Sequence, residues 1–290
     1  MISEKMILIY YYHIINIISK RGKEKMKKKL LAVCLAALCL IGFAGCGASG
    51  SGTITMAGST SMESVAKAWG EAYQLNNDVT IDVQGGGSSA GVTSVKDESA
   101  QVGMLSRELK DEEKQEGLTE YQVAIDGIAI VVNKDNKVEE LTSKQIADIY
   151  TGKITNWKDV GGADEEIVVV GREAGSGTRD GFESILDVEE KCKYKAELNE
   201  TGQVKSTVAS TKGAIGYMSL GYVDDELKAV KVDGVAPSES TVSDGSYKVQ
   251  RPFIVVTSGD ASSEVKAFVE YMLSADGQGI VESSHFVKVK

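Results

Sequence analysis

Three times in this chain of 290 residues, an apolar, strand-like run ends in a short turn rich in glycine, serine and threonine and leads into a helix-like segment. The turns lie at residues 58–61, 85–91 and 171–179. A helix that starts at such a turn presents unpaired backbone N–H groups and the positive end of its dipole, and both attract an anion. The repeated pattern predicts an α/β fold in which several helix N-termini converge on one small oxyanion.

The third turn carries the most chemical groups. Arg172 and Arg179 add positive charge, and Ser176 and Thr178 add hydroxyl donors. One such turn alone is more often only a turn, the two hydroxyl residues have a second interpretation as helix N-caps, and Arg179 has one as a surface ion-pair residue. The presence of three turns at strand–helix junctions favours a binding site.

Strand-like and helix-like segments alternate from residue 53 onward, which is typical of α/β layers with largely parallel sheets. Trp69 and Trp157 are predicted to be packing residues. The expected strands are 53–57, 79–84, 101–105, 167–170 and 214–218, and the expected helices are 61–73, 88–96, 143–150, 178–186, 203–210, 262–273 and 276–283.

Two long extended runs, 121–133 and 247–257, interrupt this alternation, and the first is broken at Asp126-Gly127. We expect the chain to cross between two lobes at these runs. One lobe then consists of 53–126 plus 253–290, and the other of 127–252. A ligand is expected in the cleft between them, at the carboxyl ends of the strands.

The N-terminal region has the pattern of an export signal. A basic start at 26–29 is followed by an apolar stretch at 30–43 that is too short to span a membrane comfortably, and then by small residues before Cys46. We interpret 26–45 as a lipoprotein signal peptide and 46–52 as a lipidated tether, with an uncleaved anchor helix as the alternative. Residues 1–25 fit no signal architecture, and we interpret them as lying upstream of the true initiator, Met26.

Charge and cysteine content narrow the class of protein further. The chain has 32 basic and 42 acidic residues; without residues 1–45, which hold 8 and 2 of these, it has 24 and 40 and a net charge of −16. So acidic a chain disfavours nucleic acid and anionic membrane surfaces as partners. Cys192 is the one cysteine after Cys46, so no internal disulfide is expected, and a lone cysteine is most often a small buried apolar residue.

The inventory of reactive residues argues against an enzyme. After residue 45 the chain has a single histidine, His285, close to the C-terminus, and nothing nearby supports a catalytic triad. The turn at 175–178 lacks the lysine of a nucleotide-binding P-loop. No cluster of cysteine and histidine suggests a metal site, and we expect neither a metal nor a cofactor.

The chain resembles a known family along nearly its whole length after the leader. The most specific stretch runs from Leu141 to Gly162 and includes Asp148-Ile149-Tyr150-Thr151-Gly152; 213–223 and 274–278 also match, as do the turn segments 57–61, 85–91 and 172–178. These segments resemble the phosphate-binding protein of the bacterial phosphate ABC importer. The resemblance implies a periplasmic-binding-protein type II-like fold with two α/β lobes joined by two extended hinge crossovers.

The resemblance also implies ligands for phosphate. Thr60 and Ser61 would donate from the first helix start, Ser88 from the second, and Arg172 through a bidentate guanidinium contact. The third helix start would contribute Ser176, Gly177 and Thr178.

One position departs from the family pattern. Several members place an aspartate after the third strand, where it accepts the proton of hydrogen phosphate and repels sulfate, and the matching residue here is Ser106. We hypothesise that Asp126 is the replacement acceptor and that Arg107 adds a second cation. The alternative for Asp126 is a hinge residue without ligand contact, and for Arg107 a surface ion-pair residue.

The function implied by the resemblance is capture of inorganic phosphate on the outer face of the cell membrane and delivery to an ABC permease, which works with a separate cytoplasmic ATPase. Two alternatives stay open at this point. One is a phosphate-sensing or adhesive surface lipoprotein, and the other is a receptor for another oxyanion such as sulfate, molybdate or tungstate.

Overall fold

The computed structural model describes residues 52–114 and 117–289. The predicted signal peptide at 26–45, Cys46 and the tether up to residue 51 lie outside these ranges, as do residues 1–25. The last residue of the predicted tether, Gly52, instead begins the first strand. Within the described ranges, no helix has the length and apolar character needed to cross a membrane.

One group of elements comes from the two ends of the described chain and encloses its own hydrophobic core. Trp69 is fully buried in this core with Phe268, and its indole Nε1–H donates to the carbonyl of Gly277 at 2.8 Å. The elements are β1 (Gly52–Gly58), α3 (Glu63–Gln74), β2 (Val79–Gln84), α4 (Ser88–Lys96), β3 (Val102–Leu105), α9 (Ser263–Leu273) and α10 (Ala275–Ser283).

The middle of the chain forms a second group around a separate core. Trp157 is buried there, its indole donates to Gly213 O at 2.8 Å, and the rings of Phe182 and Tyr217 stack with centroids 4.0 Å apart. Both tryptophans are therefore packing residues, as predicted. The elements are β5 (Glu140–Leu141), α5 (Ser143–Tyr150), η1 (Trp157–Val160), β6 (Val168–Arg172), α6 (Gly177–Ile185), β7 (Ala196–Leu198), α7 (Thr201–Ser210), β8 (Ala214–Ser219), η2 (Leu220–Tyr222), β9 (Leu227–Ala229), β10 (Lys231–Val232) and α8 (Glu239–Ser243).

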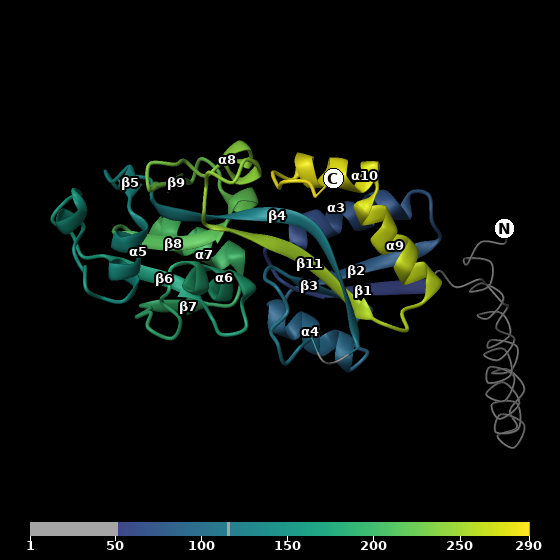
Figure 1. Ribbon diagram of the computed structural model, residues 1–290. Coiled ribbons are helices and arrows are strands. Elements are labelled where there is room, and N and C mark those ends of the chain that lie inside the picture. Colours follow the sequence, from purple (N-terminus) through teal and green to yellow (C-terminus); the bar gives the residue numbers. More distant parts are fainter. Residues whose placement is uncertain (1–51, 115–116, 290) are drawn as a thin grey trace, which may run out of the picture. The chain divides into compact units, whose positions relative to one another are not determined.

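Two strands connect the groups, β4 (Leu118–Asn133) and β11 (Gln250–Ser258), and Figure 1 shows them running between the two sets of elements. The first part of β4 pairs with β11 as far as Gly127, and from Ile128 onward it pairs with β8. The apolar sequence pattern is interrupted at Asp126-Gly127, and β4 continues through these two residues as one extended strand. What changes at this point is the pairing partner.

The strand order is β2-β1-β3-β11-β4-β8-β6-β7, with β9 also paired to β4. The pairs of β1 with β2 and β3, and of β6 with β7 and β8, are parallel, as expected for strand–helix–strand units. The two connecting strands are antiparallel to each other, and β11 to β3 and β4 to β8 are antiparallel too. The expectation of largely parallel sheets is corrected to a mixed sheet, because the chain crosses between the groups in opposite directions.

Element boundaries follow local signals closely. The helix predicted at 143–150 matches α5, which has a capping box of Thr142 and Gln145. The helix predicted from Ser61 begins instead at Glu63, because the preceding residues form a turn in which the Met62 N–H donates to Ser59 O at 3.1 Å. Because the residues just before α3 form this turn and not part of the helix, their side chains can contact residues that are distant in the sequence.

Candidate anion-binding site

The three predicted turns meet at one place. Ser61, just before α3, lies 2.9 Å from Thr178 in the first turn of α6, measured between the two hydroxyl oxygens. At the start of α4, the Ser89 N–H donates to Gly175 O at 3.1 Å. A Cβ atom placed on Gly177 would lie only 2.3 Å from the hydroxyl oxygen of Ser88. The N-termini of α3, α4 and α6 therefore converge, as predicted from the sequence.

The hydroxyl groups at this meeting point are buried and paired. Ser61, Ser88 and Ser106 have no exposed surface, and Thr60 and Thr178 have almost none. Buried polar groups are costly unless they form hydrogen bonds. Among the described residues, Thr257 Oγ1 is the one buried side-chain N or O atom without a hydrogen-bond partner, so the buried hydroxyl oxygens at the meeting point all have partners.

Arg172 ends β6 beside this cluster, and its guanidinium holds the segment that leads into α7. Its Nε donates to Leu198 O at 3.0 Å, and its two terminal nitrogens donate to Asn199 O at 2.8 Å and to Thr201 Oγ1 at 3.3 Å. Burial lowers the pKa of Arg172 to about 10, so the side chain stays positively charged at neutral pH. The predicted bidentate contact with an anion stays a prediction.

Ser106, at the position where the family resemblance led us to expect an aspartate, lies inside the hydroxyl cluster. Its Oγ accepts a hydrogen bond from Ser59 Oγ at 2.8 Å, and its backbone N–H donates to Ser88 Oγ at 3.0 Å. Ser59 was not among the candidate ligands identified from the sequence, although it lies in the first glycine-serine turn.

Arg107 is buried and forms ion pairs with two carboxylates. Its terminal nitrogens donate to Glu113 at 2.7 and 2.9 Å, its Nε donates to Asp180 at 2.9 Å, and one terminal nitrogen also donates to Ser89 Oγ at 3.2 Å. The pKa of Glu113 is lowered, because the hydrogen bonds and charges of Arg107 and Lys110 outweigh the raising effect of burial. The structure thus gives Arg107 a role in joining α6 to the segment after β3.

Asp126 forms a buried ion pair with Arg251, the residue directly opposite on β11. Its Oδ2 accepts from Nε and a terminal nitrogen of that arginine at 3.1 and 2.8 Å, and its Oδ1 accepts from Ser219 Oγ at 2.8 Å and from the Leu220 N–H at 3.2 Å. Burial raises the pKa of Asp126 in spite of the arginine. Its carboxylate is fully occupied by these four donors, and the hypothesis that it accepts the phosphate proton stays untested.

Arg179 pairs mainly with acidic residues, and one of its terminal nitrogens also donates to the backbone carbonyl of Arg172 at 3.1 Å. Its Nε donates to Glu183 at 2.8 Å, a terminal nitrogen donates to Glu197 at 2.5 Å, and its guanidinium stacks over the ring of Tyr194. Ser176 is the N-cap of α6 and accepts from the backbone N–H of Arg179, so the N-cap interpretation of Ser176 is confirmed.

A fourth helix N-terminus joins the cluster and was missed. The Thr201 hydroxyl lies 3.0 Å from that of Thr60 and 3.3 Å from that of Ser61, and the Thr201 N–H donates to Thr60 Oγ1 at 3.2 Å. The Tyr222 hydroxyl donates to Thr60 O at 2.9 Å. Thr201 begins α7 shortly after β7, so the same strand–turn–helix pattern was the signal that could have found it.

A Gly-x-Ser-x-Gly spacing, typical of hydrolase nucleophiles, occurs at 87–91 with Ser89 in its centre. The Ser89 hydroxyl accepts from Arg107, and His285 instead contacts Glu239 at 2.8 Å and is largely exposed. Within 52–114 and 117–289, His285 is the one histidine, and it contacts Glu239 and not this serine.

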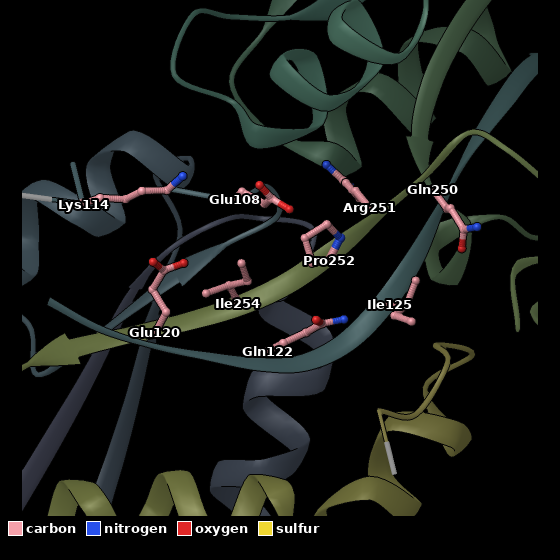
Figure 2. A pocket seen from close by; sticks show the side chains of 9 residues that line it. All are labelled: Glu108, Lys114, Glu120, Gln122, Ile125, Gln250, Arg251, Pro252 and Ile254. Carbon is pink, nitrogen blue, oxygen red and sulfur yellow. The ribbon is translucent and has the colours of Figure 1, made fainter. Parts of the chain in front are cut away.

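A pocket of about 690 Å³ opens beside the connecting strands (Figure 2). Its walls carry charges of both signs, from Glu108, Glu120 and Lys114. Arg251 also lines this pocket, and it is the residue that the pocket shares with the hydroxyl cluster and its ion pairs. With Lys114 and Arg251 against Glu108 and Glu120, this lining is balanced in charge and does not favour an anion.

Comparison with known proteins identifies the family of this chain. The family model of the PBP superfamily domain matches residues 46–276. The phosphate-binding protein PstS of Bacillus subtilis strain 168 is 34% identical over 287 residues, which cover 91% of this chain and 95% of that protein. This chain belongs to the PstS family of the PBP superfamily. The resemblance predicted from the sequence is thereby confirmed.

Two solved structures of PstS-like proteins extend the comparison to the fold. A protein from Clostridium perfringens, assigned to a phosphate ABC transporter and solved with bound phosphate, is 46% identical with a TM-score of 0.80, over 82% of this chain and all of that one. An ABC-type phosphate transport receptor from Vibrio cholerae is 35% identical with a TM-score of 0.68, over 81% and 99% of the two chains. The predicted α/β fold of the periplasmic-binding-protein type II-like class is confirmed.

Proposed function

We propose that this chain captures inorganic phosphate at the cluster of helix N-termini and delivers it unchanged to an ABC importer. The observation that carries the proposal is the convergence of three helix starts and Arg172 around buried hydroxyl groups. Such a set of fixed donors replaces the water around a tetrahedral oxyanion. The names of the relatives, which are those of phosphate-binding proteins, support the same ligand.

Calorimetric titration tests the ligand. Residues 46–290, which include the compact unit from Ser51 onward, are stripped of bound phosphate and titrated with phosphate, sulfate and molybdate. We expect phosphate to bind with a micromolar or tighter Kd, corresponding to about 8 kcal/mol or more. A protein that does not bind phosphate, or that binds molybdate more tightly, would contradict the proposal.

The delivery step depends on two lobes that close over the ion. We assign 53–126 plus 253–290 to one lobe and 127–252 to the other, which is supported by the two separate hydrophobic cores. The connecting strands β4 and β11 then serve as the hinge, and closure creates the surface that a membrane permease recognises. ATP hydrolysis takes place in a separate cytoplasmic subunit, and the chain itself performs no catalysis.

The ion pair of Arg107 and Asp180 joins the two proposed lobes and is expected to stabilise the closed form. Asp180→Asn should weaken phosphate binding about 3- to 10-fold, mainly through faster release, because one partly buried ion pair contributes about 1 kcal/mol. Stopped-flow release of phosphate measures this. The control is Asp148→Asn, which breaks ion pairs with Lys144 and Lys153 inside one lobe and should leave release unchanged. Equal release rates in all three proteins would refute the prediction.

Cys46 is proposed to carry a lipid that anchors the protein on the outer face of the membrane. Cys46→Ser should move the protein from the membrane fraction to the medium or periplasm, because a diacylglyceryl group is needed for stable anchoring. Cell fractionation and the mass of the mature N-terminus measure this. Cys192→Ser is the matched control and should stay in the membrane fraction, since Cys192 is a half-buried thiol whose pKa burial raises to about 11. Retention of the Cys46 variant in the membrane would argue for an uncleaved anchor helix.

A further inference from the structure

Arg251 is a buried side chain that connects the crossover strands to the anion-binding cluster. It lies near the start of β11, in the second of the two crossovers, and has 4% of its surface exposed. Figure 2 shows it leaving this strand beside Pro252. One of its terminal nitrogens donates to Ser106 O at 3.1 Å, and the other donates to Ser61 Oγ at 3.2 Å. A single guanidinium thus holds two residues that face the predicted anion.

The same guanidinium neutralises a buried carboxylate, that of Asp126. Asp126 accepts two hydrogen bonds from Arg251, and Ser219 and Leu220 occupy its other oxygen. A free carboxylate beside an anion repels it, and a buried charge without a partner is more costly still. The pairing therefore removes a repulsive charge from the neighbourhood of the cluster.

The contact with Ser61 also sets the direction of its hydroxyl hydrogen. A guanidinium has only donors, so Ser61 Oγ has to accept from Arg251 and its own hydrogen points elsewhere. The remaining neighbours of this oxygen are the hydroxyls of Thr178 at 2.9 Å and Thr201 at 3.3 Å, both at helix starts of the cluster. Ser61 is thereby oriented as a donor on the side where the helix N-termini meet.

We propose that Arg251 is a positioning residue for anion binding, which fixes the Ser61 hydroxyl as a donor and holds Asp126 neutralised. The proposal rests on the proposed function, because it concerns how the same cluster binds phosphate. Arg251 acts through Ser61 and Ser106 and is not itself a ligand of the anion. Its three contacts require the planar, multiply donating group of arginine.

The test compares phosphate affinity with stability in residues 46–290. Arg251→Met should weaken the Kd for inorganic phosphate by about 30-fold or more, since it exposes the cluster to an unpaired carboxylate. Arg251→Lys keeps the charge but cannot reach Asp126, Ser61 and Ser106 at once, and about 5- to 10-fold weaker binding is expected. If the methionine variant does not fold, the lysine variant alone carries the test.

A matched control separates positioning from a structural role. Ser219→Ala removes a hydrogen bond to Asp126 without touching Ser61 or Arg251, so it should lower the urea midpoint while the phosphate Kd stays within about twofold. A double-mutant cycle tests whether Arg251 acts through Ser61. In a Ser61→Ala background, the loss of phosphate affinity caused by Arg251→Lys should be clearly smaller than in the wild-type background.

The outcomes separate the two proposals. If the wild-type protein does not bind phosphate, the proposed function fails and this inference fails with it. If the wild type binds and the folded Arg251 variants bind equally well, the inference alone is overturned. Full additivity of the Arg251 and Ser61 substitutions would likewise overturn it, because Arg251 would then not act through Ser61.

Discussion

Arg172→Met is expected to weaken phosphate binding at least about 100-fold, the largest loss for any single side chain of the cluster. Arg172 is buried at the edge of the hydroxyl cluster and remains charged at neutral pH, with a pKa of about 10. Charge-assisted hydrogen bonds to an oxyanion are each worth about 1.5–3 kcal/mol, and methionine keeps the apolar stem while removing all of them. Titration calorimetry measures the change in Kd.

The control for this variant is Arg179→Met. Arg179 lies on the following helix and is paired with Glu183 and Glu197, and its contact with Arg172 is to the backbone carbonyl and not to the guanidinium. The Arg179→Met variant should bind phosphate with a Kd within about twofold of the wild-type value. Arg172 also holds the carbonyls of Leu198 and Asn199, so urea unfolding of the Arg172 variant is measured in parallel. A folded Arg172 variant with wild-type affinity would remove Arg172 from the site.

Gly177→Ala is expected to weaken phosphate binding by roughly 100-fold while the protein stays folded. A Cβ at this position would lie 2.3 Å from Ser88 Oγ and 2.7 Å from Ser106 Oγ, both in the opposite proposed lobe. The backbone of Gly177 is not in the left-handed region, so alanine is tolerated within the helix itself. Overpacking of this kind costs about 1–3 kcal/mol, and opening of the lobes relieves it at the expense of the closed, ligand-bound form.

Gly202→Ala is the matched control, because Gly202 also lies in the first turn of a helix of the cluster and a Cβ there would meet no atom within 4 Å. It should bind phosphate as the wild type does. Calorimetry gives the Kd of both variants, and thermal unfolding without phosphate should show similar midpoints. Wild-type affinity in Gly177→Ala would mean that α4 and α6 do not approach each other in the bound form.

Much of the site was predictable because its signals are local. The turns before α3, α4 and α6 each combine a strand end, small or hydroxyl residues and a helix start within about ten residues. Local rules on capping and helix dipoles then point to hydroxyl groups such as those of Ser176 and Thr178, and the family resemblance adds Ser88. The structure brings these donors together in one buried cluster.

The roles of the charged residues were less predictable. Arg107 and Asp126 were both hypothesised to face the anion, and in the structure each is paired with a group of opposite charge. A buried charged side chain pairs with whichever opposite charge the fold brings next to it. Arg107 and Asp180, for example, are 73 residues apart in the sequence. No sequence pattern links positions so far apart.

Most of the longer strands and helices, the glycine-serine turns and the family were predictable from the sequence, because these depend on periodicity, caps and motifs within short segments. Two contacts became known from the three-dimensional fold alone: Arg251 pairs with Asp126, 125 residues away, and Thr201 contacts Thr60 across 141 residues. These contacts depend on the register of the two antiparallel crossover strands and on how four helix N-termini pack. Both are set by long-range packing and burial, which the order of residues along the chain does not reveal.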